Sequence, residues 1–134
     1  MKRHTWKKRN PRGATVVETA LVLPLLLILT FGGIKYGWLF FRWHQVTNIT
    51  RHAARVAARP GDRSGEVAVL IAERMEASGI AGYSYTISNP TPGTGESLVL
   101  EISVPGGEVD ILNIPLLPRP TTLSASMALS KEGP

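Results

Sequence analysis

The chain has 134 residues, contains no cysteine and carries a formal net charge of +5 at neutral pH. The lack of cysteine excludes a disulfide-stabilised fold and thiol catalysis. Six basic residues lie in residues 1–12, so the rest of the chain has a net charge of −1, and the basic balance does not indicate a nucleic-acid-binding face.

A basic leader is followed directly by a long apolar run. The leader covers residues 1–13 and ends at Gly13, and Thr19–Ile34 contains no charged residue. Because about 20 helical residues cross the hydrocarbon core of a bilayer, we predict a transmembrane segment over residues 14–41, in contact with membrane lipid. This segment includes Thr19, Pro24 and Trp38.

The charges around this segment predict its orientation. Six basic residues precede it, whereas three follow closely (Arg42, Arg51 and Arg55), so we expect a cytoplasmic amino terminus and an extracytoplasmic carboxyl-terminal part. Glu18 is an acid near the start of the apolar run, where a carboxylate usually has a partner or a role. Lys35 can reach the membrane interface along its aliphatic stem.

The helical pattern continues beyond the predicted span. Apolar residues recur at three- and four-residue spacing between Val46 and Ala57, so residues 42–60 are predicted to extend the same helix outside the membrane. The whole helix should run from about residue 15 to about residue 58 and end before Pro60-Gly61. A basic row repeats every four residues on another face of this helix and comprises Arg51, Arg55 and Arg59. The row could contact another subunit, bind anionic headgroups or be a solvated face.

Residues 61–134 have the pattern of a small α+β domain. Residues 65–78 predict a second, short helix, which Asp62 or Ser64 can cap. Period-two alternation predicts three half-buried strands, at residues 83–88, 98–104 and 123–129. We therefore expect an α+β fold with a long amino-terminal helix, a short second helix and a small antiparallel sheet. A core this small should need the upper half of the long helix to cover the sheet.

The sequence contains no pattern of catalytic chemistry. Phosphate loops and the HExxH and GxSxG motifs are absent. His44 and His52 lie eight residues apart with no cysteine and no nearby acid, which makes a poor metal site. We predict no enzymatic activity, no catalytic, cofactor or metal site, and no small-molecule substrate.

Three stretches of the first helix resemble a known family. Residues 13–27 (GATVVETALVLPLLL), 31–37 (FGGIKYG) and 48–57 (NITRHAARVA) are similar to TadE-like proteins, the minor pseudopilins of tight-adherence (Flp-type) pilus systems. The resemblance covers roughly residues 12–58. The chain departs from the family pattern at Thr19, where an aromatic residue is frequent, and at Lys35, where an acid is frequent.

The resemblance implies a pilin-like fold and a role in pilus assembly. In such proteins a prepilin peptidase cuts after the glycine, which here places the cut between Gly13 and Ala14. The glutamate at the fifth mature position, here Glu18, helps to align the subunit with its neighbours. The implied partners are the prepilin peptidase, other pilin or pseudopilin subunits and the assembly machinery. The implied location is the bacterial inner membrane, with a periplasmic carboxyl-terminal domain and possible entry into a surface filament.

Two other classes of protein fit the basic leader and apolar run. An ordinary secretory signal peptide fits poorly, because the apolar run is too long and no Ala-x-Ala site follows it. The alternative that stays open is a single-span membrane protein without leader processing, whose external domain is an envelope scaffold or a binding module. The amino-terminal residue of the native protein distinguishes this alternative from a pseudopilin.

Overall fold

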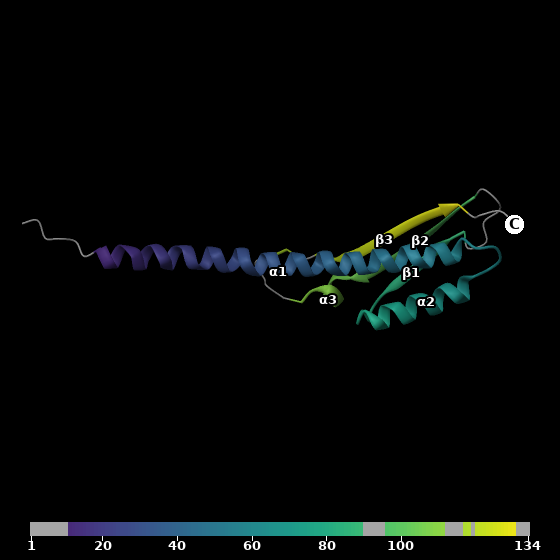
Figure 1. The fold of residues 1–134 in the computed structure, drawn as a ribbon, viewed down its shortest axis with the longest axis horizontal. Coiled ribbons are helices and arrows are strands. Elements are labelled where there is room, and N and C mark those ends of the chain that lie inside the picture. Colours follow the sequence, from purple (N-terminus) through teal and green to yellow (C-terminus); the bar gives the residue numbers. More distant parts are fainter. Residues whose placement is uncertain (1–10, 90–95, 112–116, 119, 131–134) are drawn as a thin grey trace, which may run out of the picture. The chain divides into compact units, whose positions relative to one another are not determined.

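A computed structural model describes residues 11–89, 96–111, 117–118 and 120–130, so most of the predicted leader lies outside the described part. Figure 1 shows the order of the elements along the chain. They are α1 (Pro11–Ala57), α2 (Ser64–Ala77), β1 (Ser84–Ser88), β2 (Ser97–Pro105), α3 (Gly106–Val109) and β3 (Thr122–Ser130). The chain divides into two compact units, one up to Ile34 and the other from Lys35 onward.

The long predicted helix is confirmed, and it begins earlier than expected. Helix α1 starts at Pro11 rather than near residue 15. Proline suits the first helical position, because the amide hydrogen that it lacks would have no partner there. The helix ends at Ala57, followed by a backbone hydrogen bond of 3.2 Å from Arg59 to Val56. Gly61 then turns the chain with a φ of +87°, a conformation that side chains other than glycine rarely adopt.

The second helix also lies where its pattern predicted. Helix α2 covers Ser64–Ala77, one residue away from the predicted range at each end. Asp62 accepts a hydrogen bond of 3.0 Å from the backbone N–H of Ser64. This bond lowers the pKa of the Asp62 carboxyl, because it stabilises the charged form. At the other end Gly79 has a φ of +65°, which closes the helix.

The three strands form one antiparallel sheet in the order β1-β2-β3, which confirms the α+β fold. Strand β2 is central, and its four apolar side chains that face the core are completely buried. They are Leu98, Leu100, Ile102 and Val104. The opposite face is mostly polar, and there the hydroxyl oxygens of Ser84 and Ser103 lie 2.8 Å apart on paired positions. The sheet therefore has one buried face and one solvated face.

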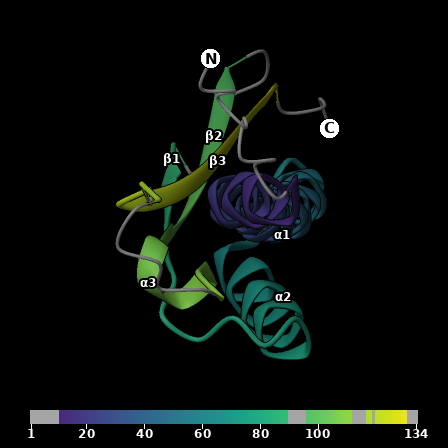
Figure 2. The same ribbon diagram turned by 90° about the vertical axis from the view of Figure 1, so that its left-hand side faces the viewer.

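The core of the second unit lies between this sheet and two helices. Figure 2 shows the sheet on one side of the carboxyl-terminal part of α1 and α2 on another. The part of α1 after Lys35 contributes Val46, Ile49, Ala53, Ala54, Val56 and Ala57 to the core, and α2 contributes Val67, Ile71 and Met75. The expectation that the upper half of the first helix completes the core is thus confirmed. Without it, β2 and α2 would expose their apolar faces.

A four-residue helix, α3, follows β2 directly and was not predicted. Its first residue, Gly106, is buried and donates a backbone hydrogen bond of 2.9 Å to Thr121. A Cβ atom at this position would lie 1.9 Å from the carbonyl oxygen of Pro120. Only glycine allows this close approach of two backbone segments. Most of the segment before Pro120 (residues 112–116 and 119) lies outside the described residues.

Candidate functional site

The amino-terminal part of α1 is an apolar helix without a protein partner in its own unit. Every side chain from residue 13 to residue 31 is exposed, and Leu21 and Leu29 each expose 73% of their surface. Among the described residues, one helix, Gly13–Ala57, is long and apolar enough to cross a membrane. An apolar helix exposed on all sides requires an apolar environment. This part of the chain fits a single-pass membrane protein.

Two threonine hydroxyls within this apolar stretch are satisfied inside the helix. The hydroxyl of Thr19 donates to the carbonyl of Thr15 at 2.9 Å, and the hydroxyl of Thr30 donates to the carbonyl of Leu26 at 2.8 Å. Such bonds remove the penalty of an unpaired hydroxyl in lipid. Pro24 lies inside the helix and lacks an N–H, so one hydrogen bond of the backbone ladder is missing there.

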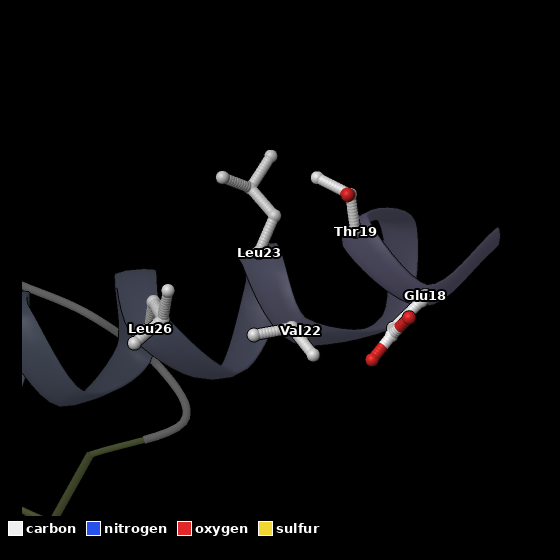
Figure 3. Close-up of a pocket in the computed structure, with 5 residues that line it drawn as sticks. All are labelled: Glu18, Thr19, Val22, Leu23 and Leu26. Carbon is white, nitrogen blue, oxygen red and sulfur yellow. The ribbon is translucent and has the colours of Figure 1, made fainter. Parts of the chain in front are cut away.

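Glu18 borders a shallow groove on the surface of this helix. Figure 3 shows the five side chains that line the groove. Glu18, Val22 and Leu26 follow one another at four-residue spacing and form one ridge, and Thr19 and Leu23 form the next. A groove between two such ridges is the surface that receives the ridge of a neighbouring helix. The carboxylate of Glu18 is exposed and has no ion-pair partner among the described residues.

The predicted cleavage position lies within the first turns of α1. Gly13 and Ala14 are both exposed, and a Cβ atom built on Gly13 meets nothing within 4 Å. Gly13 was expected to separate the leader from the helix, but the helix already begins at Pro11. The expectation is therefore corrected: the bond between Gly13 and Ala14 lies inside α1.

Lys35 forms a buried ion pair that the sequence did not reveal. Its Nζ atom lies 3.1 Å from Oδ2 of Asp110, which directly follows α3, and the two side chains are 1% and 5% exposed. The side chain was expected to extend along its stem toward the membrane interface, whereas its ammonium is buried within the folded unit. Moving the Lys35 ammonium and the Asp110 carboxylate out of water carries a high desolvation penalty. The two charges are tolerated in the protein interior because each neutralises the other. This pair attaches α1 to the segment after β2.

Two turns further along α1, Arg42 attaches the helix to the end of α2. Its guanidinium donates to the carbonyl of Ser78 and, at 3.2 Å, to the side-chain oxygen of Gln45. It also lies 4.7 Å from the ring centroid of Trp38, within the range of a cation–π interaction. A positive charge at the carboxyl end of α2 is favourable, because the last carbonyls of a helix are unsatisfied and carry partial negative charge. Trp38 is thus half-buried under Arg42, while Phe40, Phe41 and Trp43 remain exposed.

The three arginines of the basic row are exposed on the outer part of α1. Arg59 lies 3.9 Å from Glu66, which also pairs with Arg63 at 3.2 Å. Arg51 and Arg55 have no ion-pair partner among the described residues. Both arginines line hollows that border β3. In the described part of the chain, no group of three or more residues is arranged to hold a metal ion.

Comparison with known proteins supports the resemblance seen in the sequence. Comparison with curated proteins found no match, and comparison with solved structures found none. The family model described as TadE-like protein matches residues 13–55. This match includes the apolar helix, the groove at Glu18, Lys35 and two of the three arginines. It confirms the predicted TadE-like resemblance over this segment. The TadE-like family is a structural family associated with pili. Residues 13–55 thus form a TadE-like segment, which indicates a protein associated with the tight-adherence (Tad) pilus.

Proposed function

We propose that this protein is a membrane-anchored minor pseudopilin that acts in the assembly of a tight-adherence pilus or a related secretion apparatus. It works through contacts with other subunits and not through catalysis. The observation that carries the proposal is the exposed carboxylate of Glu18 beside a groove in an otherwise apolar, exposed helix that matches the TadE-like family. Such a charge has no use in a simple anchor, whereas it is favourable where a second subunit supplies a cation.

A prepilin peptidase is the proposed partner in maturation, cutting between Gly13 and Ala14. Glycine in a helix is less favourable than alanine by about 1 kcal/mol, and no contact in the described structure requires glycine at position 13. A requirement from outside the fold, such as close approach of a protease to the backbone, accounts for its presence. Cleavage would leave a new α-amino group at Ala14, about one helical turn from Glu18.

This new amino group is the proposed partner of Glu18 in a neighbouring subunit. Within a bilayer either charge alone is costly, so an intermolecular pair between the Ala14 amine and the Glu18 carboxylate would favour association. The groove formed by Val22, Leu26 and Leu23 beside Glu18 would hold the apolar ridge of the neighbouring helix. Charge pairing would then fix the axial position of one subunit against the next.

The proposed location is the bacterial inner membrane, with the leader in the cytoplasm and the α+β domain in the periplasm. The six basic residues before the span support this orientation. Thr19–Ile34 contains no charged residue, which supports a span that begins near residue 14. Lys35 and Leu39 are buried within the folded unit, so we place the end of the span near Ile34 and not at residue 41. A reporter that is active only outside the cytoplasm, fused after Pro134, should be active. An inactive fusion on a membrane-inserted protein would refute the orientation.

The assembly role is tested by Glu18→Gln. Glutamine has nearly the same shape but no charge, so membrane insertion and cleavage should persist. Recovery of other pilin subunits that co-purify from membranes should fall strongly, because loss of one member of a buried pair costs about 3–5 kcal/mol. The matched control is Glu73→Gln, which makes the same change at an exposed position of α2.

Two outcomes separate the assembly role from its alternatives. Recovery that falls for Glu18→Gln and stays unchanged for Glu73→Gln supports the pseudopilin. Equal recovery for wild type and both variants at matched expression would mean that the Glu18 carboxylate is solvated in the headgroup region. In that case a single-span scaffold or binding protein becomes the better description of the molecule.

A further inference from the structure

The outer edge of β3 is an open sheet edge. In the described part of the chain, β3 pairs with β2 on one side and with no strand on the other. An unpaired edge presents a row of N–H and C=O groups, which proteins usually protect with charged residues, proline or a bulge. Strand β3 is nine residues long and contains neither a charged residue nor a proline. Its edge is therefore able to accept a further strand.

A strand added beside β3 would also bury apolar side-chain surface of β3 itself. Leu123, Met127 and Leu129 face the core and are half-buried, whereas the residues of β2 opposite them are completely buried. The difference arises because β2 has a neighbour on both sides and β3 has one. A strand added at this edge would cover these three side chains.

Two hollows follow the same edge, between β3 and α1. One is about 330 Å³ and lies between residues 43–51 of α1 and residues 124–127 of β3. The other is about 430 Å³ and lies between residues 55–60 and residues 129–130. The two hollows thus lie along β3 from residue 124 to residue 130. Space for the side chains of an added strand exists along this length.

The charge of these hollows defines the occupant. Arg51 lines the first and Arg55 the second, and neither has an ion-pair partner among the described residues. The two free edge strands of this sheet, β1 and β3, carry no acidic residue, so a second copy of either edge strand offers no complementary charge. Two copies paired through β3 would instead bring their arginine rows to the same seam, where they would repel each other. The complementary partner is an acidic segment of another protein.

We propose that the edge of β3, together with Arg51 and Arg55, binds an extended acidic segment of another protein chain as a fourth strand of the sheet. Main-chain hydrogen bonds to β3 supply affinity, and the arginines select acidic side chains on the face of the segment that points toward α1. This interaction involves only the unit that begins at Lys35. It therefore does not depend on cleavage of the leader or on Glu18.

The test uses the full chain in uncharged detergent micelles and labelled nine-residue peptides, which match β3 in length. In the first peptide glutamate alternates with valine, and in the second lysine replaces glutamate. Two further peptides carry N-methyl groups on one or the other set of alternate residues of the first peptide. Fluorescence anisotropy reports the binding of each peptide.

The acidic peptide should bind with a Kd below about 1 mM, and the lysine peptide should bind at least about tenfold more weakly. N-methylation of one alternate set should abolish binding, because those amides pair with β3, and methylation of the other set should leave it. The double variant Arg51→Glu/Arg55→Glu should weaken binding of the acidic peptide by about tenfold or more. Arg74→Glu, an exposed position on α2, is the matched control and should have no effect.

Three results would overturn the proposal. The first is no binding of the acidic peptide, or equal binding of the acidic and lysine peptides. The second is equal binding of both N-methylated peptides and the unmethylated one, which would mean that the arginines attract the peptide without strand pairing. The third is unchanged affinity in the Arg51→Glu/Arg55→Glu variant, which would exclude a role for the basic row.

Discussion

Removal of one member of the Lys35–Asp110 pair should strongly destabilise the folded unit. The two charges lie 3.1 Å apart and are 1% and 5% exposed. At an effective dielectric constant of about 20 they attract each other by about 5 kcal/mol. Burial of each ion costs several kcal/mol, so the pair as a whole contributes little net stability. Asp110→Leu leaves the Lys35 ammonium buried without this partner, and we expect a loss of about 3–5 kcal/mol.

The double variant Lys35→Met/Asp110→Leu should recover most of this loss. Apolar residues of similar volume need no charge partner, so the double variant should be close to wild type or more stable. The free energy of unfolding is measured by urea titration of the full chain in detergent, with tryptophan fluorescence as the signal. Trp38 lies one turn from Lys35 on the half-buried side of α1, so its emission reports on this region. A loss below about 1 kcal/mol for Asp110→Leu would refute a buried pair. A double variant that is as unstable as Asp110→Leu alone would refute it as well.

Three further changes test other parts of the fold. Gly106→Ala should lower the free energy of unfolding by at least about 1–3 kcal/mol in the same titration, because the new Cβ would lie 1.9 Å from the carbonyl oxygen of Pro120; unchanged stability would contradict this close approach. Arg42→Met should destabilise the unit by about 1–3 kcal/mol, because the end of α2 loses a charged hydrogen-bond donor; a wild-type midpoint would show that the contact contributes nothing. The Asp62 carboxyl has a lowered pKa in the folded protein, so its bond to Ser64 stabilises the start of α2 fully at pH values above the ordinary carboxyl pKa of 3.8. This stabilisation is lost as the pH falls through the pKa of the folded state. Amide exchange at the start of α2 should therefore lose less protection on acidification in Asp62→Asn than in wild type, and identical pH profiles would contradict the assignment.

The elements that the sequence predicted well are those with long, regular patterns. The apolar run and the three- and four-residue spacing up to Ala57 predicted α1, and period-two alternation predicted all three strands. The match of residues 13–55 to the TadE-like family agrees with the resemblance stated from Gly13, Glu18 and the following apolar residues. These features are local, so a single stretch of sequence contains all the information.

The features that the sequence did not predict join residues that are far apart along the chain. The sequence did not predict the ion pair of Lys35, because its partner Asp110 lies 75 positions away and no local pattern connects the two residues. A lone lysine within an apolar run does indicate that some partner exists. Arg42 binds a backbone carbonyl, which has no sequence signature. The order of the strands, and with it the open edge of β3, follows from tertiary pairing and not from the alternation within each strand.

The identity of the amino-terminal residue tests the proposed function most directly. Native protein is purified from membranes of cells that contain a prepilin peptidase, and its intact mass and first residue are determined. We predict that the mature chain begins at Ala14, and that Gly13→Leu or loss of the peptidase leaves the chain starting at Met1. A wild-type membrane protein that keeps Met1 beside an active peptidase, or that begins beyond Phe41, would contradict the pseudopilin assignment.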